Sequence, residues 1–222
     1  MVVAIDGPAG TGKSTVARYV ARALGFLYVN SGALYRAITW KVLEHADDPD
    51  AQDQIVEAAD ELDVYVDAGE MRVEGVPEER VLYGHEVNRW VSRHSSISQV
   101  RDSVNRCLRR LATERNVVVE GRDITTVVFP DAHVKVYLDA SVETRARRRF
   151  EQGLTNESLE EIRASIESRD TRDRAKQSGA LRRSDDAVYV DTSDLTIDEV
   201  CETVLRTIQR QEYFQELQGN HE

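Results

Sequence analysis

Short apolar runs alternate with longer stretches of helical periodicity along most of this 222-residue chain. Five runs are rich in β-branched residues and have the length of buried strands, and they span residues 2–6, 26–29, 116–120, 133–139 and 187–191. The helical patterns between them are typical of a parallel sheet covered by helices, which binds its ligands beyond the carboxyl ends of the strands. The pattern therefore predicts an α/β fold with a central parallel five-stranded sheet.

Two stretches interrupt this alternation. Residues 62–83 alternate with a period of two around Gly69 and Gly75, as small antiparallel hairpins do, and predict a small β-rich insert. Residues 141–183 form a charged helical segment with ten arginines, which predicts a helical lid. We therefore expect a single domain made of a core (1–61, 84–140 and 184–222), an insert (about 62–83) and a lid (about 141–183).

A glycine-rich turn follows the first predicted strand. Its sequence, "GPAGTGKS", fits the phosphate-loop template of Gly, four residues, Gly, Lys and Ser or Thr. Gly7, Gly10 and Gly12 allow successive N–H groups to converge on an anion, at the start of a helix that carries partial positive charge. Lys13 adds a full charge aimed at the terminal phosphates, and the Ser14 hydroxyl can ligate Mg²⁺. A chance glycine turn is the weaker alternative, because strand, loop and helix occur here in the order that the motif requires.

Composition narrows the choice of partners. The chain has 29 basic and 40 acidic residues and a net charge of −11, which argues against nucleic acid or an anionic membrane as the main partner. No apolar run has the length of a membrane span, and a core strand that starts at Val2 leaves no room for a signal peptide, so we expect a cytoplasmic protein. The apolar stripe near 196–217 is more typical of a core-facing helix than of a partner surface, which favours a monomer.

Charged residues follow two of the predicted strands and so fall on the same rim as the glycine-rich turn. "NSGALYR" at 30–36 puts Tyr35 and Arg36 one turn into a helix, and "EGRDITTVVFPDA" at 120–132 projects Arg122 and Asp123 beyond a buried strand. Core packing does not explain charge at these places. An ion pair between Arg122 and Asp123 is an alternative, although adjacent side chains tend to point apart.

The arginines of residues 141–183 admit two interpretations. On exposed helices most arginines are solvated partners of acidic residues three or four positions away, and we interpret most of the ten in this way. "RDTRDRAK" at 169–176 differs, because it gathers Arg169, Asp173 and Lys176 near one helical face. An arginine-rich flap over a phosphate site would exclude water and supply positive charge to a transferring phosphoryl group.

Together, the phosphate loop, "NSGALYR", "GRDITTVVFPDA", "VKVYLDAS" and "RDTRDRAK", in that order and spacing, closely resemble the bacterial cytidylate kinases of the nucleoside monophosphate kinase group. The phosphate loop alone is shared with many nucleotide hydrolases, whereas "GRD" followed by "TVVFPDA" is specific to this family. The resemblance extends over nearly the whole chain. It implies a three-layer P-loop fold and transfer of the ATP γ-phosphate, with Mg²⁺, to CMP or dCMP, giving ADP and CDP or dCDP.

The resemblance also implies roles for particular residues. Those implied at the ATP site are Gly7, Pro8, Ala9, Gly10, Thr11, Gly12, Lys13, Ser14, Thr15 and Arg148, with Arg145 and Arg149 as alternatives to Arg148. Ser14 is the implied Mg²⁺ ligand. Those implied at the substrate site are Ser31, Gly32, Tyr35, Arg36, Ser92, Arg101, Arg122, Asp123, Arg169, Asp173 and Lys176. The implied catalytic residues are Lys13, Arg36, Arg122 and Asp123.

Within the implied substrate site, each part of the nucleotide has its own residues. The acceptor phosphate falls to Arg36 and Arg122, and the ribose to Arg169 and Asp173. The cytosine ring falls to Ser92, Arg101 and Asp123. Chemistry supports the last assignment, because a carboxylate accepts a hydrogen bond from the exocyclic amine of cytosine and would repel the carbonyl of uracil.

Three positions depart from the commonest family pattern. Asn30 stands where Asp is usual, Thr125 where Gly is usual and Lys176 where Arg is usual. A guanidinium holds a phosphate through two parallel hydrogen bonds and an ammonium does not, so we expect Lys176 to hold a phosphate more weakly or at a different place. Asn30 removes a charge near the expected Mg²⁺.

Other classes of nucleotide-dependent protein fit less well. A GTP-dependent switch normally carries Asn-Lys-x-Asp and Asp-x-x-Gly, and neither string occurs in the sequence. A kinase of adenylate would not need the set of Ser92, Arg101 and Asp123. Shikimate lacks the acceptor phosphate that Arg36 and Arg122 are expected to bind.

Overall fold

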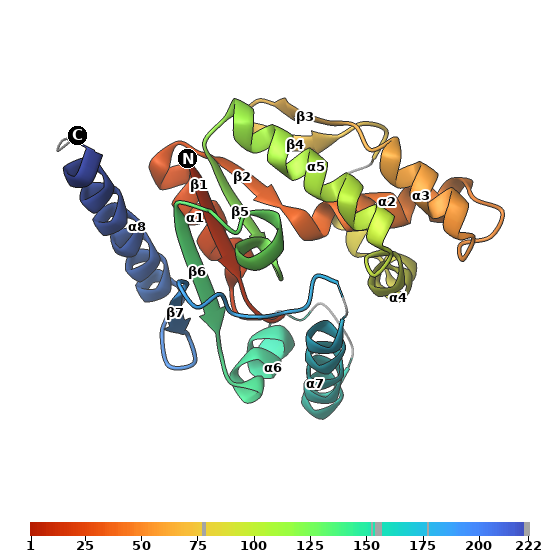
Figure 1. Cartoon of the computed structure of the whole chain (residues 1–222). Coiled ribbons are helices and arrows are strands. Elements are labelled where there is room, and N and C mark those ends of the chain that lie inside the picture. Colours follow the sequence, from red (N-terminus) through yellow and green to blue (C-terminus); the bar gives the residue numbers. More distant parts are fainter. Residues whose placement is uncertain (77–78, 152, 154–156, 177, 220–222) are drawn as a thin grey trace.

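The computed structural model describes residues 1–76, 79–151, 153, 157–176 and 178–219. Within these residues a five-stranded parallel sheet has the strand order β2-β5-β1-β6-β7 (Figure 1). Its strands are β1 (Val2–Asp6), β2 (Leu27–Asn30), β5 (Val117–Gly121), β6 (Val134–Asp139) and β7 (Val188–Asp191). The predicted sheet is confirmed, and each strand lies within one residue of its expected bounds.

Helices cover both faces of the sheet. They are α1 (Lys13–Leu24), α2 (Ser31–His45), α3 (Gln52–Asp60), α4 (His85–His94), α5 (Ser98–Glu114), α6 (Val142–Glu151), α7 (Leu159–Ala175) and α8 (Ile197–Gly219). Helix α8 lies on one side of the sheet and α2 to α5 lie on the other (Figure 1). The three layers of the expected P-loop fold are therefore present.

The central strand β1 is apolar on both faces, as a strand between two helical layers must be. Successive side chains of a strand point to opposite faces, so Val3 and Ile5 enter the core that α1 and α8 share. Ala4 enters the second core, beneath α2 and α5. In α8 the predicted stripe is confirmed in part, since Val200, Val204 and Ile208 are buried and Ile197 is exposed. A monomeric state stays a prediction.

The insert contains one hairpin. Strands β3 (Val64–Asp67) and β4 (Glu70–Val73) pair antiparallel around Gly69, as predicted. Among the described residues of the insert, no strand follows Gly75. Gly75, with φ of 70°, forms a turn, and a 3₁₀ helix (η1, Glu79–Tyr83) follows after residues 77 and 78, which lie outside the described residues. The division of the chain into core, insert and lid stays a prediction.

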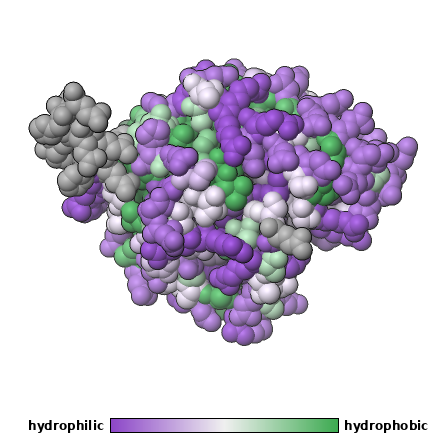
Figure 2. All heavy atoms as spheres, viewed as in Figure 1, coloured by the Kyte–Doolittle hydropathy of each residue, from purple (hydrophilic) through white to green (hydrophobic). Residues whose placement is uncertain are grey.

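The arginine-rich segment is helical, as predicted. Helices α6 and α7 pack together through Ala146, Ile162 and Ile166, and lie beyond the carboxyl ends of the strands (Figure 1). The visible face of the molecule is mostly hydrophilic, in keeping with its charged composition (Figure 2). Among the helices that the structure describes, none is both long enough and apolar enough to span a membrane.

Candidate functional site

The glycine-rich turn links β1 to α1 and has a backbone that only glycine fits at its first position. Gly7 has a φ of 150°, and a Cβ there would lie 2.0 Å from the carbonyl oxygen of Leu138. Gly12, with φ of 88°, is the N-cap of α1. The turn therefore presses against β6 at one end and delivers the N-terminus of α1 at the other, which is the arrangement of a phosphate-binding loop.

Lys13 folds back across this loop. Its ammonium donates a hydrogen bond to the Pro8 carbonyl at 2.5 Å and lies 3.5 Å from the Thr11 hydroxyl. Burial and the nearby positive charge of Arg122 hold the pKa of Lys13 well below its usual range. A buried cation with so few acceptors is suited to exchange them for the oxygens of an incoming anion. Ser14 lies beside it, exposed at the start of α1.

Arg36, on α2, is buried against the residues that lead into α4. Its Nη1 donates to the Leu82 carbonyl at 3.0 Å and to Asn88 Oδ1 at 2.9 Å, and its guanidinium lies over the Tyr83 ring, 4.4 Å from the centroid. Burial lowers the pKa of Arg36, and the nearby charge of Arg122 adds to the effect. The two arginines expected at the acceptor phosphate are therefore close enough to repel each other.

Arg122 and Asp123 point apart, so the alternative of an ion pair between them is not formed. Arg122 Nε donates to Asp173 Oδ2 at 3.2 Å. Asp123 instead forms a short ion pair with Arg101, and both of these side chains are nearly fully buried. The end of β5 therefore sends one charged side chain toward α7 and the other toward α5.

Arg101 is the centre of the candidate base site. Besides its pair with Asp123, Arg101 Nη1 donates to the Ser95 carbonyl at 3.3 Å, and the guanidinium lies 5.6 Å from the centroid of the Tyr35 ring. Its Nε is buried and has no hydrogen-bond partner among the described residues. Ser92 joins this group through its carbonyl, which accepts from Ser95 Oγ at 3.1 Å. A buried donor without a partner favours a ligand with an acceptor atom at this place.

Asp173, on α7, is surrounded by three cations. Its carboxylate lies 3.1 Å from Lys176 Nζ, 3.2 Å from Arg122 Nε and 3.9 Å from Arg169 Nε. Burial alone would raise the pKa of Asp173, but these cations outweigh it and hold the pKa below its usual value. Burial and the charge of Arg122 lower the pKa of Arg169 to about 10. The predicted gathering of Arg169, Asp173 and Lys176 on one face is confirmed.

Comparison with known proteins now identifies the family. The sequence model of the cytidylate kinases matches residues 3–210. The chain belongs to the cytidylate kinase family. A cytidylate kinase of Caldanaerobacter subterraneus is 41% identical over 94% of this chain and 94% of its own length. One from Halalkalibacterium halodurans is 41% identical over 92% of this chain and 96% of its own length.

A likeness to solved structures supports the fold alone. A crystal structure of a protein from Thermus thermophilus superposes with a TM-score of 0.52 at 21% identity, over 95% of this chain and 96% of its own length. This chain departs from the commonest residue of the family at three positions. The contacts that it forms there show what the residue at each position does.

Two of the three departures from the family pattern have a structural role. Asn30 is the N-cap of α2, where its Oδ1 accepts from the Ala33 amide at 3.2 Å and its Nδ2 lies 3.3 Å from the Tyr83 hydroxyl. An aspartate has no N–H to donate to that hydroxyl. Thr125 donates through both its amide and its hydroxyl to the buried carboxylate of Asp6. Nothing in the structure explains Lys176 beyond its ion pair with Asp173.

Three arginines of α6 have three different environments. Arg145 is buried, where it donates to the carbonyls of Ala9 (3.1 Å) and Ala140 (3.0 Å) and pairs with Asp170 at 2.7 Å. Arg148 holds the segment after β7, through the carbonyls of Thr192 (2.6 Å) and Leu195 (3.2 Å). Arg149 is exposed, and its charge helps to lower the pKa values of Arg36 and Arg169. The charge of Arg149 is therefore felt by two residues that are expected at the acceptor site.

Several polar residues of the site are missed by sequence reasoning. Glu120, at the end of β5, is buried, and its carboxylate accepts a short hydrogen bond from the Tyr28 hydroxyl. The backbone carbonyl of Glu120 accepts a hydrogen bond from Ser31 Oγ at 2.8 Å. Gly121 follows, and a Cβ at that position would lie 2.6 Å from Ser31 Oγ. The available signal was the acidic residue that ends an otherwise apolar strand.

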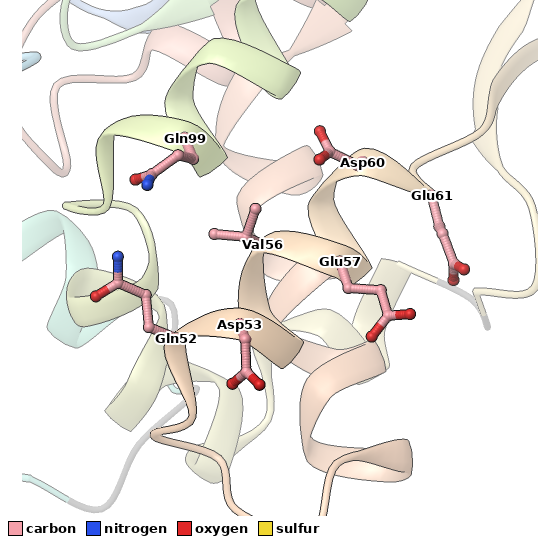
Figure 3. A pocket seen from close by; sticks show the side chains of 7 residues that line it. All are labelled: Gln52, Asp53, Val56, Glu57, Asp60, Glu61 and Gln99. Carbon is pink, nitrogen blue, oxygen red and sulfur yellow. The ribbon is translucent and has the colours of Figure 1, made fainter.

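An open groove on the surface is formed by elements other than the phosphate loop. It is lined by Gln52, Asp53, Val56, Glu57, Asp60, Glu61 and Gln99, from α3 and the start of α5 (Figure 3). Asp60 already accepts from Ser103 Oγ at 2.6 Å and from Arg106 at 2.9 Å. The groove shares no residue with the phosphate loop, so it is not part of the candidate site.

Proposed function

We propose that this chain is a cytidylate kinase that transfers the γ-phosphate of ATP to CMP or dCMP and releases ADP and CDP or dCDP. The observation that carries the proposal is the buried pair of Arg101 and Asp123 on the same rim as a phosphate loop. A pair so placed offers a carboxylate acceptor and an unpartnered Nε donor to one planar ligand. The full-length likeness to curated cytidylate kinases supports the same reaction.

The donor nucleotide binds on the phosphate loop. The backbone N–H groups of residues 9–15 surround its phosphates, and the Lys13 ammonium leaves the Pro8 carbonyl for phosphate oxygens. Mg²⁺ fits the same end of the loop, because Ser14 is exposed there and carries a hydroxyl that can ligate the ion. When bound, the ion neutralises charge that develops on the phosphate oxygens.

The acceptor nucleotide binds between α5, β5 and α7. Asp123 accepts from the exocyclic amine of cytosine, and Arg101 Nε donates to an acceptor atom of the ring. UMP would present a carbonyl to the same carboxylate and be repelled. Arg36 and Arg122 hold the acceptor phosphate, and the pair of Arg169 and Asp173 lies beside the ribose.

Little covalent chemistry is required of the protein. An acceptor phosphate oxygen is ionised at neutral pH, since its second pKa is about 6, so no general base is needed. Catalysis then depends on alignment of the two nucleotides and on positive charge around the transferring group, from Lys13, Arg36 and Arg122. Helices α6 and α7 lie beyond the strand ends, where they shield the reaction from water (Figure 1).

A coupled assay of ADP release tests this function. With ATP and Mg²⁺ present, we expect CMP and dCMP to be the fastest acceptors among CMP, dCMP, UMP, AMP and shikimate. A higher kcat/KM for AMP or shikimate than for CMP would contradict the proposal. ADP release that is independent of any acceptor would indicate a nucleotide hydrolase instead.

We expect two arginines of α6 to act on different sides of the site, Arg148 on the ATP side and Arg149 on the acceptor side. We expect Arg149→Ala to lower kcat about tenfold, because its charge reaches Arg36 and Arg169. Arg148→Ala should instead raise the KM for ATP by a few fold, because Arg148 holds Thr192, whose hydroxyl lies 3.5 Å from the Thr11 carbonyl of the phosphate loop. Steady-state kinetics with ATP and CMP varied in turn make the comparison. The opposite pattern would reverse the two roles.

A further inference from the structure

Asp6 ends β1 immediately before the phosphate loop, and its carboxylate is fully buried. It accepts three hydrogen bonds from one neighbouring segment. Oδ1 accepts from the Ile124 amide at 3.0 Å, and Oδ2 accepts from both the amide and the hydroxyl of Thr125, each at 2.7 Å. A single carboxylate therefore connects the start of the donor loop to residues 118 and 119 positions away in the sequence.

The residues held by Asp6 directly follow the two charged residues of the acceptor site. Strands β1 and β5 pair in parallel only as far as Asp6 and Gly121, so the sheet does not hold Arg122 and Asp123. After Gly121, the next hydrogen bond between the two segments joins the Asp6 carboxylate to the Ile124 amide. A short π-helical turn begins at Ile124 (η2, Ile124–Val128). Arg122 and Asp123 thus lie between two fixed points, the last strand pair and the Asp6 hydrogen bonds.

Burial of the Asp6 carboxylate costs free energy, because it removes a charged group from water. Burial raises the pKa of Asp6 to about 6, although the hydrogen bonds from Thr125 and Ile124 act in the opposite direction. An apolar side chain here would avoid that cost, but it would leave the buried amides of Ile124 and Thr125 without an acceptor. The carboxylate therefore ties these two amides and the Thr125 hydroxyl to the last residue of β1.

We propose that Asp6 and Thr125 act together as positioning residues, which fix Arg122 and Asp123 relative to the phosphate loop. The inference rests on the proposed function, since alignment matters only if donor and acceptor sit on these two segments. A phosphoryl group passes in line between them, and a misplacement of about 1 Å can cost up to about 100-fold in rate. Thr125 is the adjustable member of the pair, because its hydroxyl supplies the one side-chain hydrogen bond of the three.

Substitution at Thr125 tests the proposal. Thr125→Val keeps the shape of the side chain and removes the hydroxyl, and Thr125→Ser keeps the hydroxyl. We expect Thr125→Val to lower kcat with CMP about tenfold and the CMP-to-UMP ratio of kcat/KM about threefold, with the Kd for ATP within about twofold of the wild type. Thr125→Ser should restore both kinetic values. The matched control is Thr113→Val, since the Thr113 hydroxyl bonds only its own helix, through the Arg110 carbonyl at 2.7 Å.

The outcomes separate positioning from structure and from the proposed function. If Thr125→Val does not fold, Thr125→Ala makes the same test without the added methyl group beside a carboxylate. A folded variant of either kind with a lower melting temperature but wild-type kcat and CMP-to-UMP ratio overturns the proposal. A loss that serine does not restore also overturns it, because the hydroxyl would then be irrelevant. A wild-type protein that fails to turn over CMP contradicts the proposed function instead.

Discussion

Replacement of Lys13 by alanine is expected to lower kcat for CMP phosphorylation by at least about a thousandfold. The Lys13 ammonium is buried in the loop with the Pro8 carbonyl as its closest acceptor, at 2.5 Å, so its charge is available to the phosphates of the donor. The fold should survive, because burial disfavours the charged form of this side chain and its removal relieves that cost. Thermal melting should therefore show no loss of stability.

The comparison for this variant is Lys41→Ala, a half-buried lysine near the C-terminal end of α2, which should keep wild-type kinetics. ATP affinity, measured by calorimetry, should fall less than kcat, because the charge matters most when negative charge builds up on the transferring group. A folded Lys13→Ala protein with near-native turnover would exclude this loop as the donor site.

Replacement of Asp123 by asparagine is expected to reduce the CMP-to-UMP ratio of kcat/KM by at least about tenfold, because one hydrogen bond to a charged group contributes about 1.5–3 kcal/mol. The asparagine Oδ1 can still accept from Arg101, and its Nδ2 then faces the base. That group repels the cytosine amine and donates to the uracil carbonyl. Alanine is less suitable, because it would leave the buried guanidinium of Arg101 without its carboxylate, at a cost of about 3–5 kcal/mol in stability.

Arg122→Ala is the control for base reading. A phosphate contact carries no information about the base, so we expect kcat/KM to fall for both nucleotides and their ratio to stay within about twofold. Equal changes of the ratio in the Asp123 and Arg122 variants would show that Asp123 does not read cytosine.

The sheet and the loop were predictable because their signals are local. A buried parallel strand is an apolar run with turn residues beside it, and a phosphate loop is a string of glycines before a lysine. The rim positions of Arg36 and Arg122 followed from the strands that precede them. The turn at Gly75 was not predictable in the same way, because a period of two in a short segment fits a turn and a 3₁₀ helix as well as a second hairpin.

The partners of the charged residues were not predictable, because they come from distant parts of the chain. The sequence offers Arg145 as an alternative to Arg148 at the ATP site, whereas its side chain is buried against Asp170 and the Ala9 carbonyl of the phosphate loop. In the sequence, Asp6 is only a polar residue at the end of a predicted strand. Its hydrogen bond with Thr125 forms only in the folded chain. Local patterns therefore located the candidate site, and tertiary contacts decided how its residues are held.

The three cations around Asp173 have a consequence for how affinity is set. In the proposed reaction Arg122 leaves a carboxylate of its own protein for the phosphate of the acceptor, so binding is an exchange of one anion for another. The net gain in binding free energy is therefore the difference between the attraction of Arg122 to the phosphate and its attraction to Asp173. Any change that strengthens the hold of Lys176 on Asp173 frees Arg122 for the ligand and lowers the KM for CMP. The affinity for the acceptor phosphate is therefore set in part by Asp173, which does not itself bind that phosphate.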